Sequence, residues 1–284
     1  MNRSDHITFA LGPALLFCPA DRPDRFAKAI ERSDAVILDL EDAVAPEDKD
    51  LARQSIAEHF RKIDSELASR TVVRINPVGT PHFAADAQTL SDFTPAYVMV
   101  AKTESAEHIQ AVHTKFPHSQ IIALCETAAG AAAAYEIVDH PATSAIMWGA
   151  EDLMVSLGGT SSRHADGTYR DIARHVRSTV LLAAASRGKA AVDSIYADIG
   201  NTSGLSAEAA DAVGSGFAAK ACIHPSQVSA IRQAFLPTEE EAEYAHALLK
   251  EAEQHGGAFQ FRGGMIDAPL LRHAERIARR ALSD

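Results

Sequence analysis

The sequence has little of what would make a disulfide-stapled or membrane-embedded protein. Its 284 residues include only three cysteines, Cys18, Cys125 and Cys222, which lie far apart and form no CxxC pair. This spacing favours reduced thiols in the core of a cytoplasmic protein. No apolar run is long enough to span a membrane. The first apolar stretch turns into a predicted strand too soon for a signal peptide.

Positive charge is also scarce. The chain has 27 Lys and Arg residues against 38 Asp and Glu residues, a formal net charge of −11. Such a balance argues against nonspecific binding to nucleic acid or to an anionic membrane. An acidic substrate must therefore be attracted by a local basic cluster and not by the field of the whole molecule.

The sequence does show a regular alternation of two kinds of segment. Eight short apolar runs alternate with segments of helical period, as in a chain of βα units with parallel strands buried on both faces. We therefore predict an α/β fold, a (β/α)8 TIM barrel, with an open doubly wound sheet as the alternative. The predicted strands are residues 14–18, 35–39, 71–75, 96–100, 120–125, 145–148, 189–193 and 219–223.

The pattern changes after Pro237. Thr238 and Glu241 form a capping-box signature for a helix that runs to about residue 254. Paired glycines then frame residues 259–262, and a last helix is predicted over about 268–282. We predict a catalytic barrel domain at residues 1–236 and a C-terminal helical extension or lid at 237–284, too small for an independent core. Such a tail could pack on its own barrel or reach over a neighbouring subunit.

Acidic residues follow the fifth and sixth predicted strands. Catalytic groups of such barrels gather at the carboxyl ends of the strands, and Glu126 and Asp152 stand at two consecutive ends. Oxygen ligands with no Cys or His pair nearby favour Mg²⁺, or Mn²⁺, over Zn²⁺. The alternative for any acid here is a helix cap. Asp42 and Asp193 fit that alternative, whereas Thr127 is available to cap the helix after Glu126.

Two cations also stand at strand ends. Arg74 closes the third strand and is followed by Asn76 and Pro77. Its planar fork matches a carboxylate, which predicts substrate binding, although it could merely pair with carboxylates of the rim. Lys102, after the fourth strand, could form a Schiff base, but a role in an ion-pair network is favoured. Glu41 lies at the end of the second strand and receives no separate role.

Several short motifs occur in a fixed order along nearly the whole chain. They are Leu16-Phe17-Cys18-Pro19 with Arg22-Pro23, Asp39-Leu40-Glu41-Asp42, Arg74-Ile75-Asn76-Pro77, Glu126-Thr127-Ala128, Gly149-Ala150-Glu151-Asp152, Asp193-Ser194-Ile195-Tyr196, Lys220-Ala221-Cys222-Ile223-His224-Pro225 and Gly264-Met265-Ile266-Asp267. In these motifs the chain resembles the HpcH/HpaI aldolase/citrate lyase superfamily. The resemblance is to its citrate lyase beta-subunit-like branch of CoA-ester lyases, which includes malyl-CoA lyase-like enzymes. The chain departs from it at Ala20 and Cys125.

The resemblance implies roles for particular residues. Glu126 and Asp152 would hold Mg²⁺, and Arg74 would act on the substrate carboxylate or thioester oxygen. Gly149 and Ala150 would complete the substrate site. In relatives with a C-terminal extension, an Asp in the last motif acts as an acid or base from a neighbouring subunit, a role that falls on Asp267. Arg22, Arg25 and Lys28 are candidates for the CoA phosphates, or else a solvated helix face.

The implied function is that of a Mg²⁺-dependent C–C lyase. It would cleave a β-hydroxyacyl-CoA thioester of the malyl-CoA or citramalyl-CoA kind into an acyl-CoA and a 2-oxo acid, or catalyse the reverse Claisen-type condensation. One alternative is a citrate lyase beta subunit that cleaves a citryl thioester on an acyl-carrier protein within a complex. Another is a metal-dependent pyruvate aldolase with no CoA. We expect a cytoplasmic homo-oligomer, a trimer or hexamer with shared active sites, that binds neither nucleic acid nor membrane.

Overall fold

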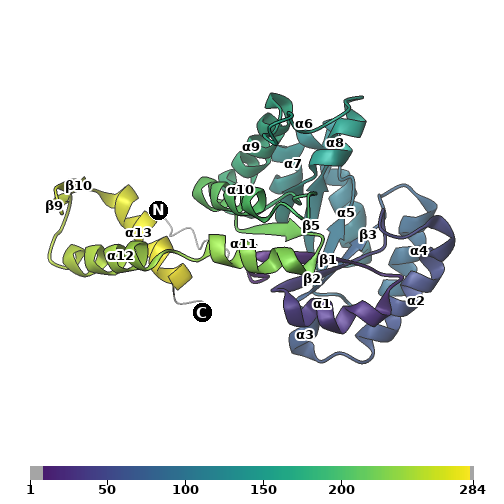
Figure 1. Ribbon diagram of the computed structural model, residues 1–284. Coiled ribbons are helices and arrows are strands. Elements are labelled where there is room, and N and C mark those ends of the chain that lie inside the picture. The colour runs from purple at the N-terminus through teal and green to yellow at the C-terminus, as the bar shows by residue number, and fades with distance from the viewer. Residues whose placement is uncertain (1–8, 282–284) are drawn as a thin grey trace. The chain divides into compact units, whose positions relative to one another are not determined.

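A computed structural model describes residues 9–281, and its centre is a closed barrel of eight parallel strands in chain order (Figure 1). Leu16 of the first strand pairs with Cys222 of the last, which closes the ring. The predicted barrel is therefore confirmed, and the open-sheet alternative is wrong. The strands are β1 (Ala14–Pro19), β2 (Ala35–Asp39), β3 (Thr71–Ile75), β4 (Tyr97–Val100), β5 (Gln120–Cys125), β6 (Thr143–Trp148), β7 (Ala190–Asp193) and β8 (Ala219–Cys222).

Helices follow each strand and surround the barrel. The sequence pattern predicts one helix over residues 128–140, but the structure divides this segment at Ala133, whose φ of −91° and ψ of 5° lie in the bridge region. Two short helices, α3 and α8, were not predicted. The helical segments of the barrel are η1 (Pro23–Arg25), α1 (Phe26–Arg32), η2 (Pro46–Asp48), α2 (Lys49–Phe60), α3 (Ser65–Ser69), α4 (Pro81–Leu90), α5 (Ala106–Lys115), α6 (Ala128–Ala132), α7 (Ala134–Asp139), α8 (Ala150–Ser156), α9 (Asp171–Ser186), α10 (Thr202–Ser215), η3 (Pro225–Gln227) and α11 (Val228–Phe235).

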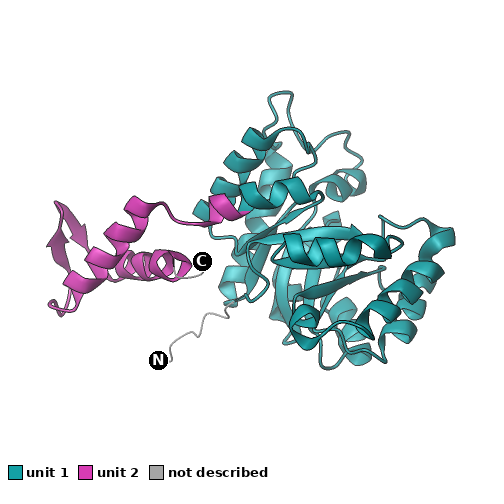
Figure 2. Cartoon of the chain, turned by 60° about the horizontal axis from the view of Figure 1, so that its bottom comes forward, with its two compact units in different colours: residues 1–231 teal, residues 232–284 magenta. Residues whose placement is uncertain are grey.

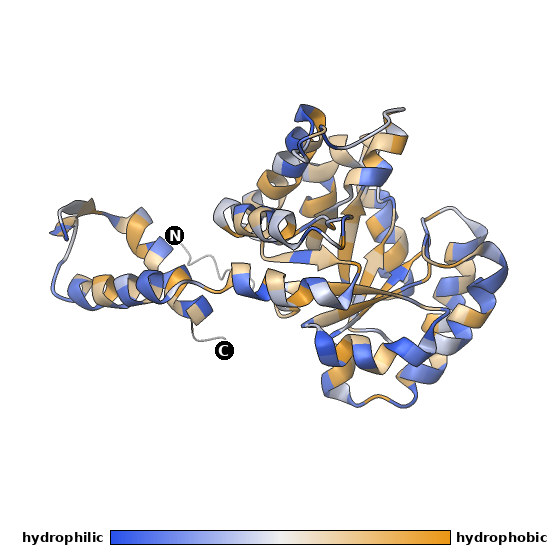
Figure 3. Cartoon of the chain, in the orientation of Figure 1, coloured by the Kyte–Doolittle hydropathy of each residue, from blue (hydrophilic) through white to orange (hydrophobic). Residues whose placement is uncertain are grey.

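The strands are apolar because both of their faces are buried. Every residue of β2, β3 and β4 is buried, and Figure 3 shows the strands in hydrophobic colours while the outer helices carry both kinds of residue. Alternate residues fill the barrel interior, as expected for a TIM barrel; they include Leu15, Ile37, Val72, Met99, Leu124, Met147, Val192 and Ala221. Cys18, Cys125 and Cys222 are buried thiols, as predicted.

The chain divides into two compact units, residues 1–231 and 232–284 (Figure 2). The second unit contains α12 (Glu239–Ala252), α13 (Ala268–Ala281) and a hairpin of β9 (Phe259–Phe261) with β10 (Gly264–Ile266). Contrary to expectation, this unit has a hydrophobic cluster of its own, which consists of Ala245, Leu248, Phe259, Ile266, Ala274 and Ile277. The assignment of residues 1–236 to catalysis and 237–284 to a lid remains a prediction.

The ends of these elements follow from local sequence. Thr238 and Glu241 form the predicted capping box of α12. The unpredicted hairpin turns at Arg262 and Gly263, whose φ angles of 45° and 86° are those of a type I′ turn. Leu282, the predicted end of the last helix, lies outside the described residues. Among residues 9–281, no helix has the length and apolar character needed to cross a membrane.

Candidate active site

The carboxyl ends of the barrel strands surround a pocket of about 280 Å³. It brings together five residues predicted from sequence: Arg74, Glu126, Gly149, Ala150 and Asp152. Strand-end side chains supply both the polar and the apolar parts of the wall. The remaining lining residues are Phe17, Pro19, Asp39, Asp42, Ala43, Leu124, Met147, Glu151, Ser194, Ile195 and Ile223.

Glu126, directly after β5, is the most deeply buried candidate metal ligand. It is 3% exposed, and its Oε1 accepts a hydrogen bond of 3.0 Å from the backbone N–H of Lys102. Burial raises the pKa of Glu126 to about 8, Arg74 opposes this rise, and the carboxylate of Asp152 adds to it. Thr127 caps α6 by accepting from the N–H of Gly130 at 3.1 Å, so Glu126 does not serve as the cap.

Gly149 makes room for that carboxylate. A Cβ at this position would lie 2.8 Å from both Cβ and Oε2 of Glu126, closer than side chains approach. Asp152 lies in the first turn of α8, where its side chain is 36% exposed and its Oδ1 is 3.5 Å from the Nζ of Lys102. The ends of β5 and β6 thus present two carboxylates to one pocket.

This donor set fits a magnesium ion. No group of three or more His, Cys, Asp or Glu residues suited to a metal exists in the part of the chain that the structure describes. Two carboxylates are nevertheless enough, because Mg²⁺ keeps several waters and takes its other ligands from the substrate. A buried carboxyl with a raised pKa is also a group whose ionised form a neighbouring cation would stabilise.

Arg74 is held at the pocket wall by two carboxylates at and just after the end of β2. Its Nε and Nη2 donate to Oδ1 and Oδ2 of Asp39 at 2.7 and 2.5 Å, and Nη1 lies 3.1 Å from Oε2 of Glu41. The guanidinium carbon lies 4.9 Å from the ring centroid of Phe17. Burial opposes the charged form, yet these carboxylates raise the pKa of Arg74. The rim pairing considered from sequence is therefore present, and it orients a cation that lines the pocket.

Sequence reasoning missed the importance of Glu41. This residue is buried and bridges two cations, since its second oxygen accepts from the Nζ of Lys102. Lys102 also lies 3.1 Å from Oδ2 of Asp42, and this set is the ion-pair network favoured for it. Burial alone would lower the pKa of Lys102, but the hydrogen bond to Glu41 raises it overall. The signal in the sequence was three acids within four residues, 39–42, at one strand end.

Four other predicted residues lie elsewhere. Arg22 precedes η1, Arg25 ends it and Lys28 lies in α1, so all three follow the pocket residue Pro19 closely in the chain. All three are exposed, and Nε of Arg22 lies 3.2 Å from Oδ1 of Asp24. Asp267 lies in the second unit, where its Oδ1 accepts from the N–H of Leu270 at 3.3 Å in the first turn of α13. Their functional roles remain predictions.

Comparison with known proteins agrees with this geometry. Residues 14–225 match the family model described as HpcH/HpaI aldolase/citrate lyase. A citrate lyase subunit beta-like protein of Mycobacterium tuberculosis is 48% identical over 272 residues, covering 96% of this chain and 96% of that protein. A mitochondrial citramalyl-CoA lyase of Rattus norvegicus is 31% identical over 296 residues, covering 95% of this chain and 86% of that protein.

A solved structure extends the likeness to three dimensions. The crystal structure of CitE from Mycobacterium tuberculosis, in complex with magnesium, acetoacetate and coenzyme A, has a TM-score of 0.88 and 48% sequence identity. It covers 96% of this chain and 98% of that chain. Two of the ligands of that protein, magnesium and coenzyme A, are the metal and the acyl carrier expected here from the strand-end carboxylates and the motifs.

Proposed function

Since the chain belongs to the HpcH/HpaI aldolase/citrate lyase family, we propose that it is a Mg²⁺-dependent lyase of β-hydroxyacyl-CoA thioesters. It would cleave a malyl-CoA- or citramalyl-CoA-like thioester into an acyl-CoA and a 2-oxo acid, or catalyse the reverse Claisen-type condensation. The observation that carries the proposal is one pocket that joins Glu126, Asp152 and Arg74. Two oxygen-donor carboxylates beside a fixed guanidinium suit the carboxylate and carbonyl oxygens of a 2-oxo acid.

Each residue has a separate task in this proposal. Glu126 and Asp152 hold Mg²⁺, which supplies Lewis-acid polarisation of the substrate carbonyl. Arg74, fixed by Asp39, stabilises the negative charge that develops on the acyl oxygen. Leu124 and Met147 form an apolar floor that excludes water from the reacting atoms.

The remaining roles concern the two ends of the thioester. Arg22, Arg25 and Lys28 bind the CoA phosphates; the support is their place on the exposed segment that directly follows the pocket residue Pro19. Asp267 of a neighbouring subunit exchanges the proton at the acyl carbon, as a carboxylate in a Gly-flanked tail could do. The enzyme would then be a homo-oligomer with shared active sites.

A second candidate function rests on the name of a relative. The protein that is 48% identical is called citrate lyase subunit beta-like, which suggests a citryl thioester on an acyl-carrier protein. The CoA bound by the similar solved structure favours the free CoA thioester instead. Offering the same acyl group on CoA and on a carrier protein would separate the two, because only the preferred carrier would support turnover.

The proposed activity is tested by a substrate screen. The protein is incubated with a series of acyl-CoAs and with glyoxylate or pyruvate in the presence of Mg²⁺, and the CoA thioesters are identified by mass spectrometry. We expect one β-hydroxyacyl-CoA to form, and we expect EDTA, Glu126→Gln or Asp152→Asn to abolish it. Calorimetric titration should show that both variants lose Mg²⁺ affinity while they remain folded. Unchanged affinity in both, or no thioester product, would contradict the proposal.

A further inference from the structure

A cluster of buried charges lies outside the barrel wall, between β7, β8 and the helices α9 and α10. Val192, Ala219 and Ala221 point into the barrel core, so the alternate residues Asp193 and Lys220 face the helices. Lys220 is fully buried. Its ammonium makes three hydrogen bonds, to Oδ2 of Asp193 at 3.1 Å, Oε1 of Glu208 at 2.8 Å and the carbonyl oxygen of Ser194 at 2.7 Å.

Asp193 is equally well satisfied. It accepts from Nε and Nη2 of Arg177 at 2.9 and 3.2 Å and from Nε1 of Trp148 at 2.8 Å. The positive charge of Lys220, together with these bonds, holds the pKa of Asp193 below its usual value, although burial alone would raise it. The helix-cap role suggested by sequence is therefore wrong for Asp193, which instead anchors the end of β7.

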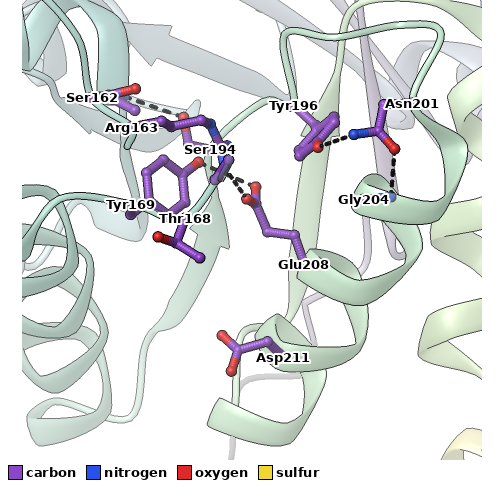
Figure 4. Close-up of polar contacts among 12 residues, drawn as sticks. Ser162, Arg163, Thr168, Tyr169, Ser194, Tyr196, Asn201, Gly204, Glu208 and Asp211 are labelled. Atoms are coloured by element: carbon purple, nitrogen blue, oxygen red, sulfur yellow. Dashed lines mark hydrogen bonds and ion pairs between the residues drawn. The ribbon is translucent and has the colours of Figure 1, made fainter. Parts of the chain in front are cut away.

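The loop between α8 and α9 is fastened to the same cluster (Figure 4). Glu208 accepts from the hydroxyl of Tyr169 at 3.1 Å, and its Oε2 lies 2.8 Å from Nη1 of Arg163. The Arg163 guanidinium lies 3.8 Å from the ring centroid of Tyr169 and 4.9 Å from that of Tyr196. The backbone around Ser162 is thus fixed next to a buried ion pair.

Two serines connect this cluster to the pocket through hydrogen bonds to the first turn of α8. The Oγ of Ser194, whose carbonyl is bound by Lys220, accepts from the backbone N–H of Ala150 at 3.3 Å. The Oγ of Ser162 donates to Oε1 of Glu151 at 2.7 Å. Ala150 and Glu151 are the two residues directly before Asp152, in the first turn of a helix only seven residues long.

Stabilising the fold does not explain why this cluster consists of charged residues. Burying several charges costs free energy, and well-packed apolar side chains of similar volume are often as stabilising or more so. What such a network does supply is fixed geometry, because each member is satisfied only in one arrangement. Fixed geometry matters for a metal ligand on a short helix, because residues that hydrogen-bond the ligands orient them and tune the metal affinity.

We propose that Ser194 and Ser162 are positioning residues for Asp152: held by the Lys220–Glu208 cluster, they fix the first turn of α8 so that Asp152 and Glu126 face one ion. The inference rests on the proposed magnesium site. It assigns the control of metal affinity to two serines that hydrogen-bond the first turn of α8, of which Ser194 also lines the pocket. In this proposal neither serine is a metal ligand, and both act through Asp152.

The test measures Mg²⁺ binding, not activity. Calorimetric titrations of the full chain compare the wild type with Ser194→Ala, Ser162→Ala and the double variant. We expect each single variant to bind Mg²⁺ roughly tenfold more weakly and the double variant about a hundredfold. The increase in thermal midpoint on adding Mg²⁺ should shrink in the same order.

Ser119→Ala is the matched control. Ser119 is also buried and donates one hydrogen bond, to the carbonyl oxygen of Pro95 at 2.6 Å, but it precedes β5 at the opposite end of the barrel. We expect this variant to lose a similar amount of thermal stability in the metal-free protein and to keep wild-type Mg²⁺ affinity.

Three outcomes overturn the inference. If the double variant keeps wild-type affinity while Glu126→Gln loses it, the serines do not position Asp152 and the proposed function stands. If Ser119→Ala weakens Mg²⁺ binding as much, the effect is a general softening of the barrel. If the wild type binds no Mg²⁺ under conditions where it is folded, the inference and the proposed metal site both fail.

Discussion

At the scale of single residues, the pocket is defined by how each charge is compensated. Arg74 and Asp39 are register partners across β2 and β3, so their strong pairing follows directly from the closed sheet. Glu126 has fewer compensating bonds, and burial leaves it with a pKa of about 8. A site that holds one carboxyl in its neutral form at pH 7 is arranged for a further positive charge.

The raised pKa of Glu126 predicts a pH-dependent stability. In the unfolded chain its carboxyl loses the proton near 4.5, whereas in the folded, metal-free protein it keeps the proton up to about 8. Between these two pH values the folded state binds more protons than the unfolded state. The contribution of Glu126 to the free energy of unfolding is therefore complete below the lower pKa, and it is lost as the pH rises through the upper pKa. Burial is the largest cause of the raised pKa; the carboxylates of Asp152 and Glu41 add to the rise, and Arg74 and Lys102 oppose it.

We therefore expect metal-free wild type to lose about 2 kcal/mol more stability than Glu126→Gln between about pH 6 and pH 8. Urea denaturation of both proteins in a chelator measures this difference, and groups common to both cancel. Added Mg²⁺ should restore the wild type at the higher pH. Equal losses in the two proteins would show that Glu126 ionises normally.

Arg74→Lys should lower kcat by orders of magnitude. An ammonium cannot reproduce the fork that satisfies both oxygens of Asp39, so the cation would no longer be fixed at the pocket wall. We also expect a stability loss of about 1–3 kcal/mol from the missing charged hydrogen bond. Steady-state kinetics and thermal melts measure both. A near-wild-type kcat/KM with a lowered melting temperature would show that Arg74 acts only as a structural ion pair.

At the scale of elements, the junction of β6 and α8 is decisive. Gly149 lies where a Cβ would be 2.8 Å from Glu126, so Gly149→Ala should displace that carboxylate. We expect weaker Mg²⁺ binding and lower activity in a protein that still folds. Gly214→Ala in α10 is the control, because nothing lies within 4 Å of its added Cβ and alanine favours a helix. Titration calorimetry on both compares them; equal Mg²⁺ affinities would refute the crowding argument.

The elements that sequence predicted are those that a local pattern specifies. All eight strands were predicted because most of them are continuous apolar runs between helical segments, although β3 and β8 each contain one cation, Arg74 and Lys220. Helix α8 was missed because its seven residues depend on tertiary hydrogen bonds such as that from Ala150 to Ser194. A helix this short is marginal without such packing.

The same reason divides the site into predicted and unpredicted parts. Glu126, Asp152 and Arg74 were identifiable because each ends a strand, and strand ends of a barrel converge. The partners of Arg74 could not be identified from the sequence. Arg74 and Asp39 are 35 positions apart, and they pair because of the register between their strands. Motif resemblance supplied Asp267, which no periodicity of the chain would have selected.

At the scale of the whole molecule, the second unit raises the question of shared sites. It has its own hydrophobic cluster and presents Asp267 at the start of α13. We predict that Asp267→Asn suppresses turnover and leaves Mg²⁺ affinity unchanged, because a proton-exchanging group is no metal ligand. Isotope exchange at the acyl carbon, followed by NMR, should be lost together with turnover.

If Asp267 acts on a neighbouring subunit, mixed oligomers should complement. Glu126→Gln and Asp267→Asn subunits, each inactive alone, would form some intact composite sites when unfolded and refolded together. The measurement is the activity of the mixture relative to each parent, with hybrid formation verified by mass spectrometry. Hybrids that form and stay inactive, or an active wild-type monomer, would show that Asp267 does not act in trans.

Closure of the barrel also affects how the chain folds during its synthesis. Leu16 finds its partner Cys222 only after 206 further positions have been synthesised, and at about 5–20 residues per second this takes roughly 10–40 s. Throughout that interval one edge of β1 has no strand to pair with, and unpaired apolar edges invite association between nascent chains. The nascent protein therefore has to stay soluble, or be shielded by a chaperone, until its last strand emerges.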